Sequence, residues 1–113
     1  MPFVAIWKFT VAAGRVPDFV RAYGPEGVWV ELFRRAEGYL STELVQSRDH
    51  NNVFVTIDSW TSQAAWNAFR EDFAGEYAAI DRLCEALTVD EVCVVQGETL
   101  PHNAAATLHH HTG

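Results

Sequence analysis

The stretch that decides the fold is Val53-Phe54-Val55-Thr56-Ile57-Asp58-Ser59-Trp60. It is rich in β-branched and aromatic residues, which favours a β-strand. Because successive side chains of a strand point to opposite faces, Val53, Val55 and Ile57 share one face, and Phe54 and Trp60 share the other. Both faces of this predicted strand are therefore apolar, and each must pack against another layer of protein.

Three more strands are predicted over residues 3–11, 39–47 and 88–96. The first of them repeats the double pattern, because Val4 and Ile6 alternate with Trp7 and Phe9. The polar residues 48–52 predict a hairpin loop between the second and third strands.

Helices are predicted in the two longer connections. The first begins near Pro17, breaks or bends at Gly24 and Pro25, and resumes until Gly38. The second follows a cap at Thr61 or Ser62 and carries aromatic residues along one side. Gly75 is expected to interrupt it, and a further helical segment runs to about residue 87.

The order of these elements predicts an α+β, ferredoxin-like βαββαβ fold with a four-stranded antiparallel sheet. The helices cover one face of such a sheet, and the other face is polar when it meets water. Here it is apolar, so a second copy of the sheet is the simplest cover. We therefore expect a homodimer that forms an α+β barrel. Residues 1–97 form the domain, and residues 98–113, without apolar periodicity, form a flexible C-terminal tail.

Composition excludes several classes of function. The formal net charge of −7 and the lack of a basic stripe argue against nucleic-acid binding. No apolar run is long enough to predict a membrane span. Cys84 and Cys93 have apolar neighbours and no metal-binding spacing, which predicts buried thiols in the cytoplasm. His109–His111 fall in the expected tail, so no metal site is predicted.

Three segments together resemble the antibiotic-biosynthesis-monooxygenase-like family of dimeric α+β barrels, over about residues 3 to 96. They are Tyr23-Gly24-Pro25-Glu26-Gly27 with Trp29 and Leu32-Phe33-Arg34-Arg35; Gly38-Tyr39-Leu40-Ser41-Thr42-Glu43-Leu44; and Ile57-Asp58-Ser59-Trp60-Thr61-Ser62 followed by Ala64 and Phe69. Members of this family include cofactor-independent oxygenases that convert polycyclic phenols or anthrones into quinones, quinol oxygenases, haem-degrading enzymes and proteins without known activity.

The resemblance implies a monooxygenase that acts on a small aromatic phenol, quinol or anthrone-type compound with dioxygen and no cofactor. Its pocket would lie between the helices and the sheet. Haem degradation is disfavoured, because Trp7 stands where those members place an Asn and no His occurs between Asn51 and Pro101. The alternative is a non-catalytic barrel that binds a small hydrophobic ligand or serves a stress-related role.

Three residues are predicted to carry the chemistry. Strand parity puts Asp58 on the same face as Trp60, and we expect the carboxylate to lie near the indole donor under an apolar roof. Such a carboxylate has a raised pKa and can accept a proton from a phenol. Tyr77, from the segment after the second helix, is the third candidate. Alternatively, Trp60 packs the core and Asp58 accepts only a structural hydrogen bond.

A second set is predicted to bind the substrate. Aromatic residues aimed at the space between the helices and the sheet would form its walls, and two polar residues could hydrogen-bond a substrate oxygen. The aromatic candidates are Trp7, Trp66, Phe69 and Phe73, and the polar ones are Asn67 and Arg70. The same aromatic residues also describe an ordinary hydrophobic core, and the polar pair is also compatible with a solvated helix face.

Overall fold

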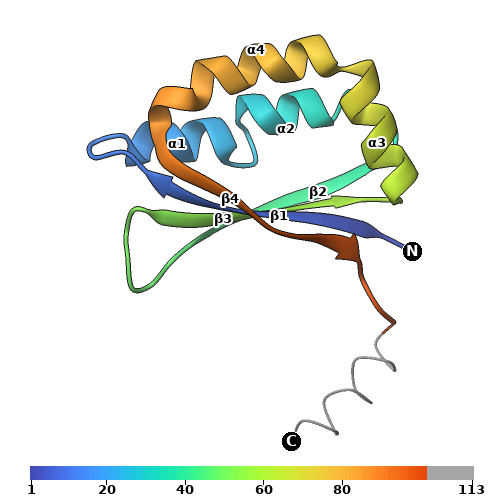
Figure 1. Ribbon diagram of the computed structural model, residues 1–113, viewed down its shortest axis with the longest axis horizontal. Helices are drawn as coiled ribbons and strands as arrows, with labels where there is room; N and C mark the ends of the chain where they lie inside the picture. Colours follow the sequence, from blue (N-terminus) through green and yellow to red (C-terminus); the bar gives the residue numbers. More distant parts are fainter. Residues whose placement is uncertain (102–113) are drawn as a thin grey trace, which may run out of the picture.

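A four-stranded antiparallel sheet carries the helices of the described part of the chain on one of its faces (Figure 1). In the computed structural model, residues 1–101 are described. The strands are β1 (Phe3–Val11), β2 (Tyr39–Gln46), β3 (Val53–Trp60) and β4 (Thr88–Glu98), in the order β2-β3-β1-β4. All three pairings are antiparallel. The predicted ferredoxin-like βαββαβ fold is thereby confirmed.

The helices follow the predicted breaks closely. They are α1 (Val16–Tyr23), α2 (Val28–Phe33), α3 (Gln63–Asp72) and α4 (Ala74–Cys84), followed by the short η1 (Glu85–Leu87). Gly24 ends α1, as expected for a position before proline. Ser62 caps α3, because its Oγ accepts a 3.1 Å hydrogen bond from the Ala65 amide. The break between α3 and α4 lies at Phe73 and not at Gly75, which lies in the first turn of α4.

The core fills the space between the helix layer and the sheet, and it is unusually aromatic. Phe3, Phe9, Phe54 and Trp60 rise from the inner face of the sheet, and all four are buried. Phe19 of α1 packs onto Phe9 and Phe54, with ring centroids 5.3 and 5.0 Å away. Large rings from both layers therefore hold the helices onto the sheet.

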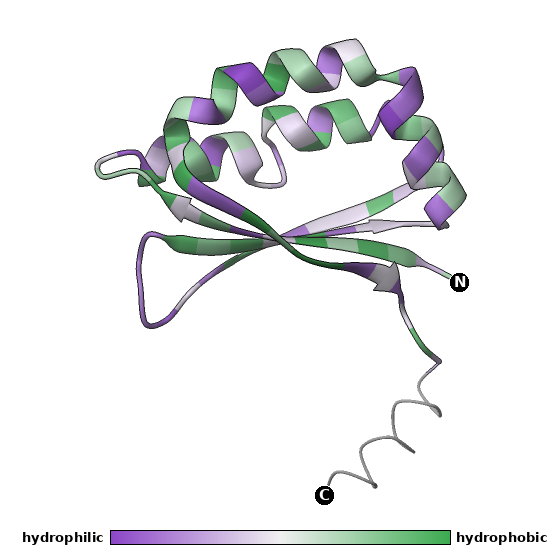
Figure 2. Cartoon of the chain, viewed as in Figure 1, coloured by the Kyte–Doolittle hydropathy of each residue, from purple (hydrophilic) through white to green (hydrophobic). Residues whose placement is uncertain are grey.

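The outer face of the sheet, which the helices leave uncovered, is also apolar. Strand register places Ile6 between Ile57 and Val95, and Lys8 between Val55 and Val92. Val92 and Val95 are each 47% exposed. Figure 2 shows hydrophobic colouring along these strands as well as on the helices. An apolar face of this kind is usually buried against another layer of protein, so the dimeric barrel stays a prediction.

Three smaller findings complete the comparison with the sequence. Cys84 is buried as expected, but Cys93 is exposed, because it lies on the edge strand β4. In residues 1–101 no helix has the length and apolar character needed to cross a membrane. β4 continues to Glu98, and residues 102–113, most of the predicted tail, lie outside the described residues.

Candidate active site

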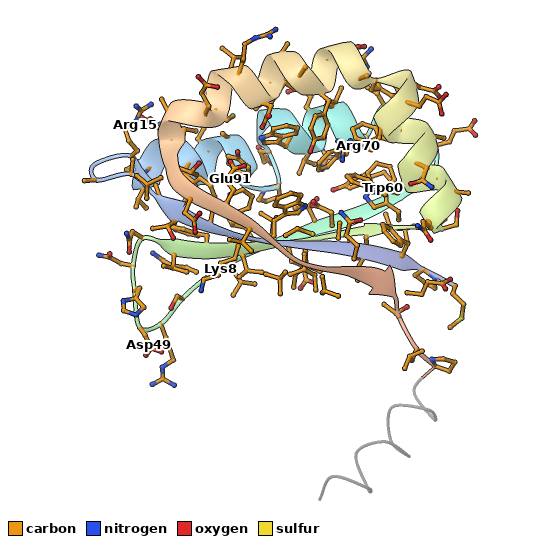
Figure 3. All side chains as sticks on the ribbon, viewed as in Figure 1. Lys8, Arg15, Asp49, Trp60, Arg70 and Glu91 are labelled. Carbon is orange, nitrogen blue, oxygen red and sulfur yellow. The ribbon has the colours of Figure 1, made fainter. Side chains whose placement is uncertain are left out.

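A partly open cavity of about 60 Å³ lies between the helices and the sheet. Most of its walls are aromatic rings, contributed by Trp7, Phe9, Tyr23, Trp29, Phe33, Trp66 and Tyr77. Its polar lining consists of Thr42, Thr56, Asp58, Asp81 and Glu91. Figure 3 shows side chains from both layers filling this space, with Glu91 and Trp60 labelled on the helix side of the sheet.

Strand alternation and register place the inner end of the cavity. Thr56 and Asp58 lie on the inner face of β3, opposite Trp7 and Ala5 of β1. Ala5 is the smallest side chain on that face of β1, whose other members are Phe3, Trp7, Phe9 and Val11. A small residue beside the carboxylate leaves room above Asp58 that a larger side chain would fill.

Asp58 is a buried carboxylate with one hydrogen-bond partner among the side chains of residues 1–101. It is only 7% exposed, and its Oδ1 accepts a 2.8 Å hydrogen bond from Thr42 Oγ1. Thr42 in turn accepts a 2.8 Å hydrogen bond from the Tyr39 hydroxyl. Among residues 1–101, no cationic side chain forms an ion pair with Asp58.

The environment of Asp58 tunes its acidity. Burial raises the pKa of Asp58 to about 6, and the Thr42 hydrogen bond opposes this rise by stabilising the charged form. A carboxylate with a pKa near the operating pH can accept a proton and later release it. The predicted elevation of the pKa of Asp58 is therefore found here.

Trp60 lies in the core and not at the cavity wall. It is fully buried, with Tyr39, Trp66 and Phe69 within 5.4 Å between ring centroids. Its indole N–H makes no hydrogen bond within the described chain. The Trp60 indole was expected to donate to Asp58, but the Thr42 hydroxyl does so instead. Trp60 packs in the core against Trp66, which lines the cavity.

Tyr77 lines the cavity from α4, and Arg70 holds it in place. The Arg70 guanidinium lies 4.4 Å from the ring centroid of Tyr77 and 5.3 Å from that of Trp66, both within cation–π range. Burial raises the pKa of Tyr77, although the charge of Arg70 lowers it in part. The Tyr77 hydroxyl is therefore protonated at neutral pH and can donate a hydrogen bond.

The other predicted binding residues do not line the cavity. Phe69 is buried behind Trp66, and Phe73 stacks on Phe69 with ring centroids 5.5 Å apart. Asn67 is exposed on α3. The structure thus brings together Trp7, Asp58, Trp66 and Tyr77 at one cavity and keeps Asn67, Phe69, Arg70 and Phe73 outside it.

Several lining residues were not predicted. Thr42 shares a face with Asp58 only through the β2–β3 register, which cannot be known before the strands are paired. Glu91 reaches the cavity because β4 pairs with β1 opposite Phe9. Asp81 lies four residues after Tyr77, so helix periodicity alone could have placed the two side chains together. Tyr23 and Trp29 belong to the segments that resemble the family, but no role in the cavity was predicted for them.

A metal centre finds no support in residues 1–101, where no cluster of three or more His, Cys, Asp and Glu side chains could hold an ion. The chemistry available in the cavity is instead that of one buried carboxylate, tyrosine and threonine hydroxyls, and aromatic walls.

Comparisons with known proteins agree with this architecture. The family model described as "Antibiotic biosynthesis monooxygenase" matches residues 2–74. Rv0793 from Mycobacterium tuberculosis is similar in structure, with a TM-score of 0.70 and 18% identity over 90% of this chain and 98% of that one. SnoaB, a cofactor-independent oxygenase from Streptomyces nogalater, has a TM-score of 0.67 and 22% identity over 89% and 98%. No curated protein matches the chain.

Proposed function

Since the chain belongs to the antibiotic biosynthesis monooxygenase family, we propose that it is a cofactor-independent monooxygenase of a small aromatic phenol, quinol or anthrone-type compound. The observation that carries this proposal is Asp58, a buried carboxylate with a pKa near 6 that lines an aromatic cavity. SnoaB, described as a cofactor-independent oxygenase, has the same fold.

In the proposed reaction Asp58 accepts the proton of a phenolic hydroxyl or of an acidic carbon. The resulting anion is electron-rich and reacts with dioxygen, so the substrate itself supplies the electrons. One oxygen atom enters the substrate, which loses two hydrogen atoms in becoming a quinone or ketone, and the other oxygen leaves as water. The protein binds, deprotonates and shields the substrate from solvent.

The cavity favours a small substrate. Its volume of about 60 Å³ is less than half that of an apolar cavity of about 150 Å³ that binds benzene. A one-ring phenol or quinol therefore needs only a local opening of the partly open side. A polycyclic anthrone needs larger movements of the lining rings.

The proposed enzyme works as a homodimer in the cytoplasm. The outer face of the sheet, with Ile6, Val55, Ile57 and Val95, is the surface we assign to the dimer contact. Two such faces packed together would form the α+β barrel. A reducing compartment would keep Cys84 and Cys93 as free thiols.

Oxygen uptake tests this function directly. The purified chain, with no cofactor added, is supplied with one-ring phenols, quinols and anthrone while dissolved oxygen is recorded. We expect uptake with at least one of these compounds, one oxygen molecule per substrate, and a quinone or ketone product. Saturable binding of the same compounds without uptake would contradict catalysis and support a non-catalytic binding protein.

A further inference from the structure

Every charged side chain that lines the cavity is acidic. Asp58 lies at the buried inner end, and Asp81 and Glu91 are exposed at the opening. Within residues 1–101, no Lys, Arg or His side chain lines it. The chain as a whole has a net charge of −7. An anionic ligand is therefore repelled here, whereas a cationic one is attracted.

The opening joins these two carboxylates to three aromatic rings. Trp29 lies 6.0 Å from Tyr23 and 4.9 Å from Tyr77 between ring centroids. Burial raises the pKa of both tyrosines, Arg70 lowers that of Tyr77 in part, and the charges of Asp81 and Glu91 raise the pKa of each. Aromatic faces beside carboxylates are the surroundings in which proteins hold organic ammonium groups.

An unsatisfied donor lies at the same end. The Trp29 indole N–H is buried and completes no hydrogen bond within the described chain, although it lies close enough to Tyr23 and Cys84 to lower their pKa values. Trp29 lines the cavity and is only 7% exposed. A buried donor with only weakly interacting acceptors is costly, and a group bound in the cavity can supply a better one.

The two polar ends of the cavity lie at different rows of the sheet. Asp58 pairs with Ala5 and Glu91 pairs with Phe9 on β1. The four residue steps from Ala5 to Phe9 span about 13 Å along the strand, and Trp7 lies on the same face between them. A ligand that reaches both ends therefore has a flat apolar middle and a polar arm, and it enters through the same local opening as a one-ring phenol.

We propose that the cavity binds an aromatic amine whose arm also carries an oxygen atom. The ammonium group lies between Asp81 and Glu91 against the rings of Tyr23 and Trp29, because the Arg70 guanidinium already stacks on Tyr77. The oxygen on the arm accepts the hydrogen bond of the Trp29 indole, and the aromatic ring points inward to Asp58. Only this last orientation rests on the proposed function, because recognition of the amine depends on residues at the opening.

Three matched compounds test the charge preference by titration calorimetry at pH 7. Octopamine carries a phenol, a hydroxyl and an ammonium group, 4-(1,2-dihydroxyethyl)phenol replaces the ammonium with a neutral hydroxyl, and 4-hydroxymandelate carries a carboxylate. We expect octopamine to bind about tenfold more tightly than the neutral diol, and 4-hydroxymandelate to bind most weakly. Equal affinity for all three, or tightest binding of the carboxylate, would overturn the proposal.

Matched double variants locate the preference. The double variant Asp81→Asn, Glu91→Gln should reduce the preference for octopamine over the neutral diol to about twofold or less. Glu71→Gln with Asp72→Asn removes the same charge from α3, away from the cavity, and should leave it intact. An equal loss in both double variants would mean that net charge alone attracts the amine, and would overturn a specific site.

Tyramine, which lacks the hydroxyl on the arm, should bind more weakly than octopamine. Equal affinity for the two amines would overturn the role of Trp29.

The binding experiment separates this inference from the proposed oxygenase activity, because calorimetry requires no turnover. A preference for the amine without oxygen uptake on any compound would contradict the oxygenase and leave the amine site standing. Oxygen uptake with phenols of every charge, without any preference in binding, would contradict the amine site and leave the oxygenase standing.

Discussion

Thr42 and Asp58 face each other across β2 and β3, and the threonine hydroxyl donates a 2.8 Å hydrogen bond to the aspartate carboxylate. The Tyr39 hydroxyl donates to Thr42 in turn, so three side chains form one hydrogen-bonded chain. Asp58 is thus oriented by a neutral donor and neutralised by no ion pair within the described residues. This arrangement keeps the pKa of the carboxyl at about 6.

Replacement of Asp58 by Asn should lower the turnover number by about 100- to 10,000-fold, because positioned acid/base groups contribute rate factors of that size. In the wild type, kcat/KM should rise with pH through about 6 as Asp58 loses its proton. Oxygen uptake on the best substrate from the panel measures both. Asp90→Asn, on an exposed position of β4, is the control. Equal rates in the two variants would remove Asp58 from the mechanism.

The same substitution should stabilise the fold at neutral pH. The pKa of Asp58 rises from 3.8 to about 6 on folding, so the folded state binds the proton more tightly and stability falls as pH rises across that window. The loss above pH 6 amounts to about 3 kcal/mol. Asp58→Asn carries no charge, and its thermal midpoint should exceed that of the wild type at pH 8, by less at pH 4. A lower midpoint at pH 8 would show that burial of the charge costs little.

Thr42→Val should raise the pKa of Asp58 further, because it removes the hydrogen bond that favours the carboxylate. Thr42→Ser keeps the hydroxyl and should restore the wild-type pKa. Carbon-detected NMR titration of the Asp58 carboxyl measures this without a substrate. An unchanged pKa in Thr42→Val would mean that another donor, such as water, replaces the hydroxyl.

Gly38→Ala should destabilise the fold more than Gly14→Ala. Both glycines have positive φ, 88° and 77°, where an alanine costs about 1–2 kcal/mol. Only Gly38 also lacks space, because an added Cβ would lie 2.6 Å from Ala65 Cβ and 2.7 Å from Thr61 Oγ1. Urea denaturation of the two variants compares them. Equal losses would show that α3 moves freely away from this turn.

Ile57→Asp should separate the proposed dimer or unfold it, because an unpaired carboxylate between two sheets costs several kcal/mol. Val20→Asp makes a similar change on α1, where Val20 is 41% exposed, and should leave the association state unchanged. Analytical ultracentrifugation gives the mass of each. A wild type that sediments as a monomer at micromolar concentration would contradict the dimer.

Alternating patterns in the sequence were enough to predict the fold. Three features were readable because neighbouring residues specify local backbone geometry. They are the apolar residues on both faces of β3, the breaks at Gly24 and Pro25, and the cap predicted at Thr61 or Ser62, which the structure assigns to Ser62. The same parity predicted that Trp7 and Asp58 share the helix side, and helix periodicity aimed Trp66 there. All three line the cavity.

The partners of those residues were decided only by the tertiary structure. Trp60 and Asp58 share a face, yet the indole turns into the core and Thr42, sixteen positions before Asp58, supplies the hydrogen bond. Glu91 and Asp81 meet at the opening because β4 pairs with β1 and α4 lies above it. Register and layer packing set such contacts, and both arise from pairing of distant segments, so parity along the chain can name the face of a residue but not its neighbour.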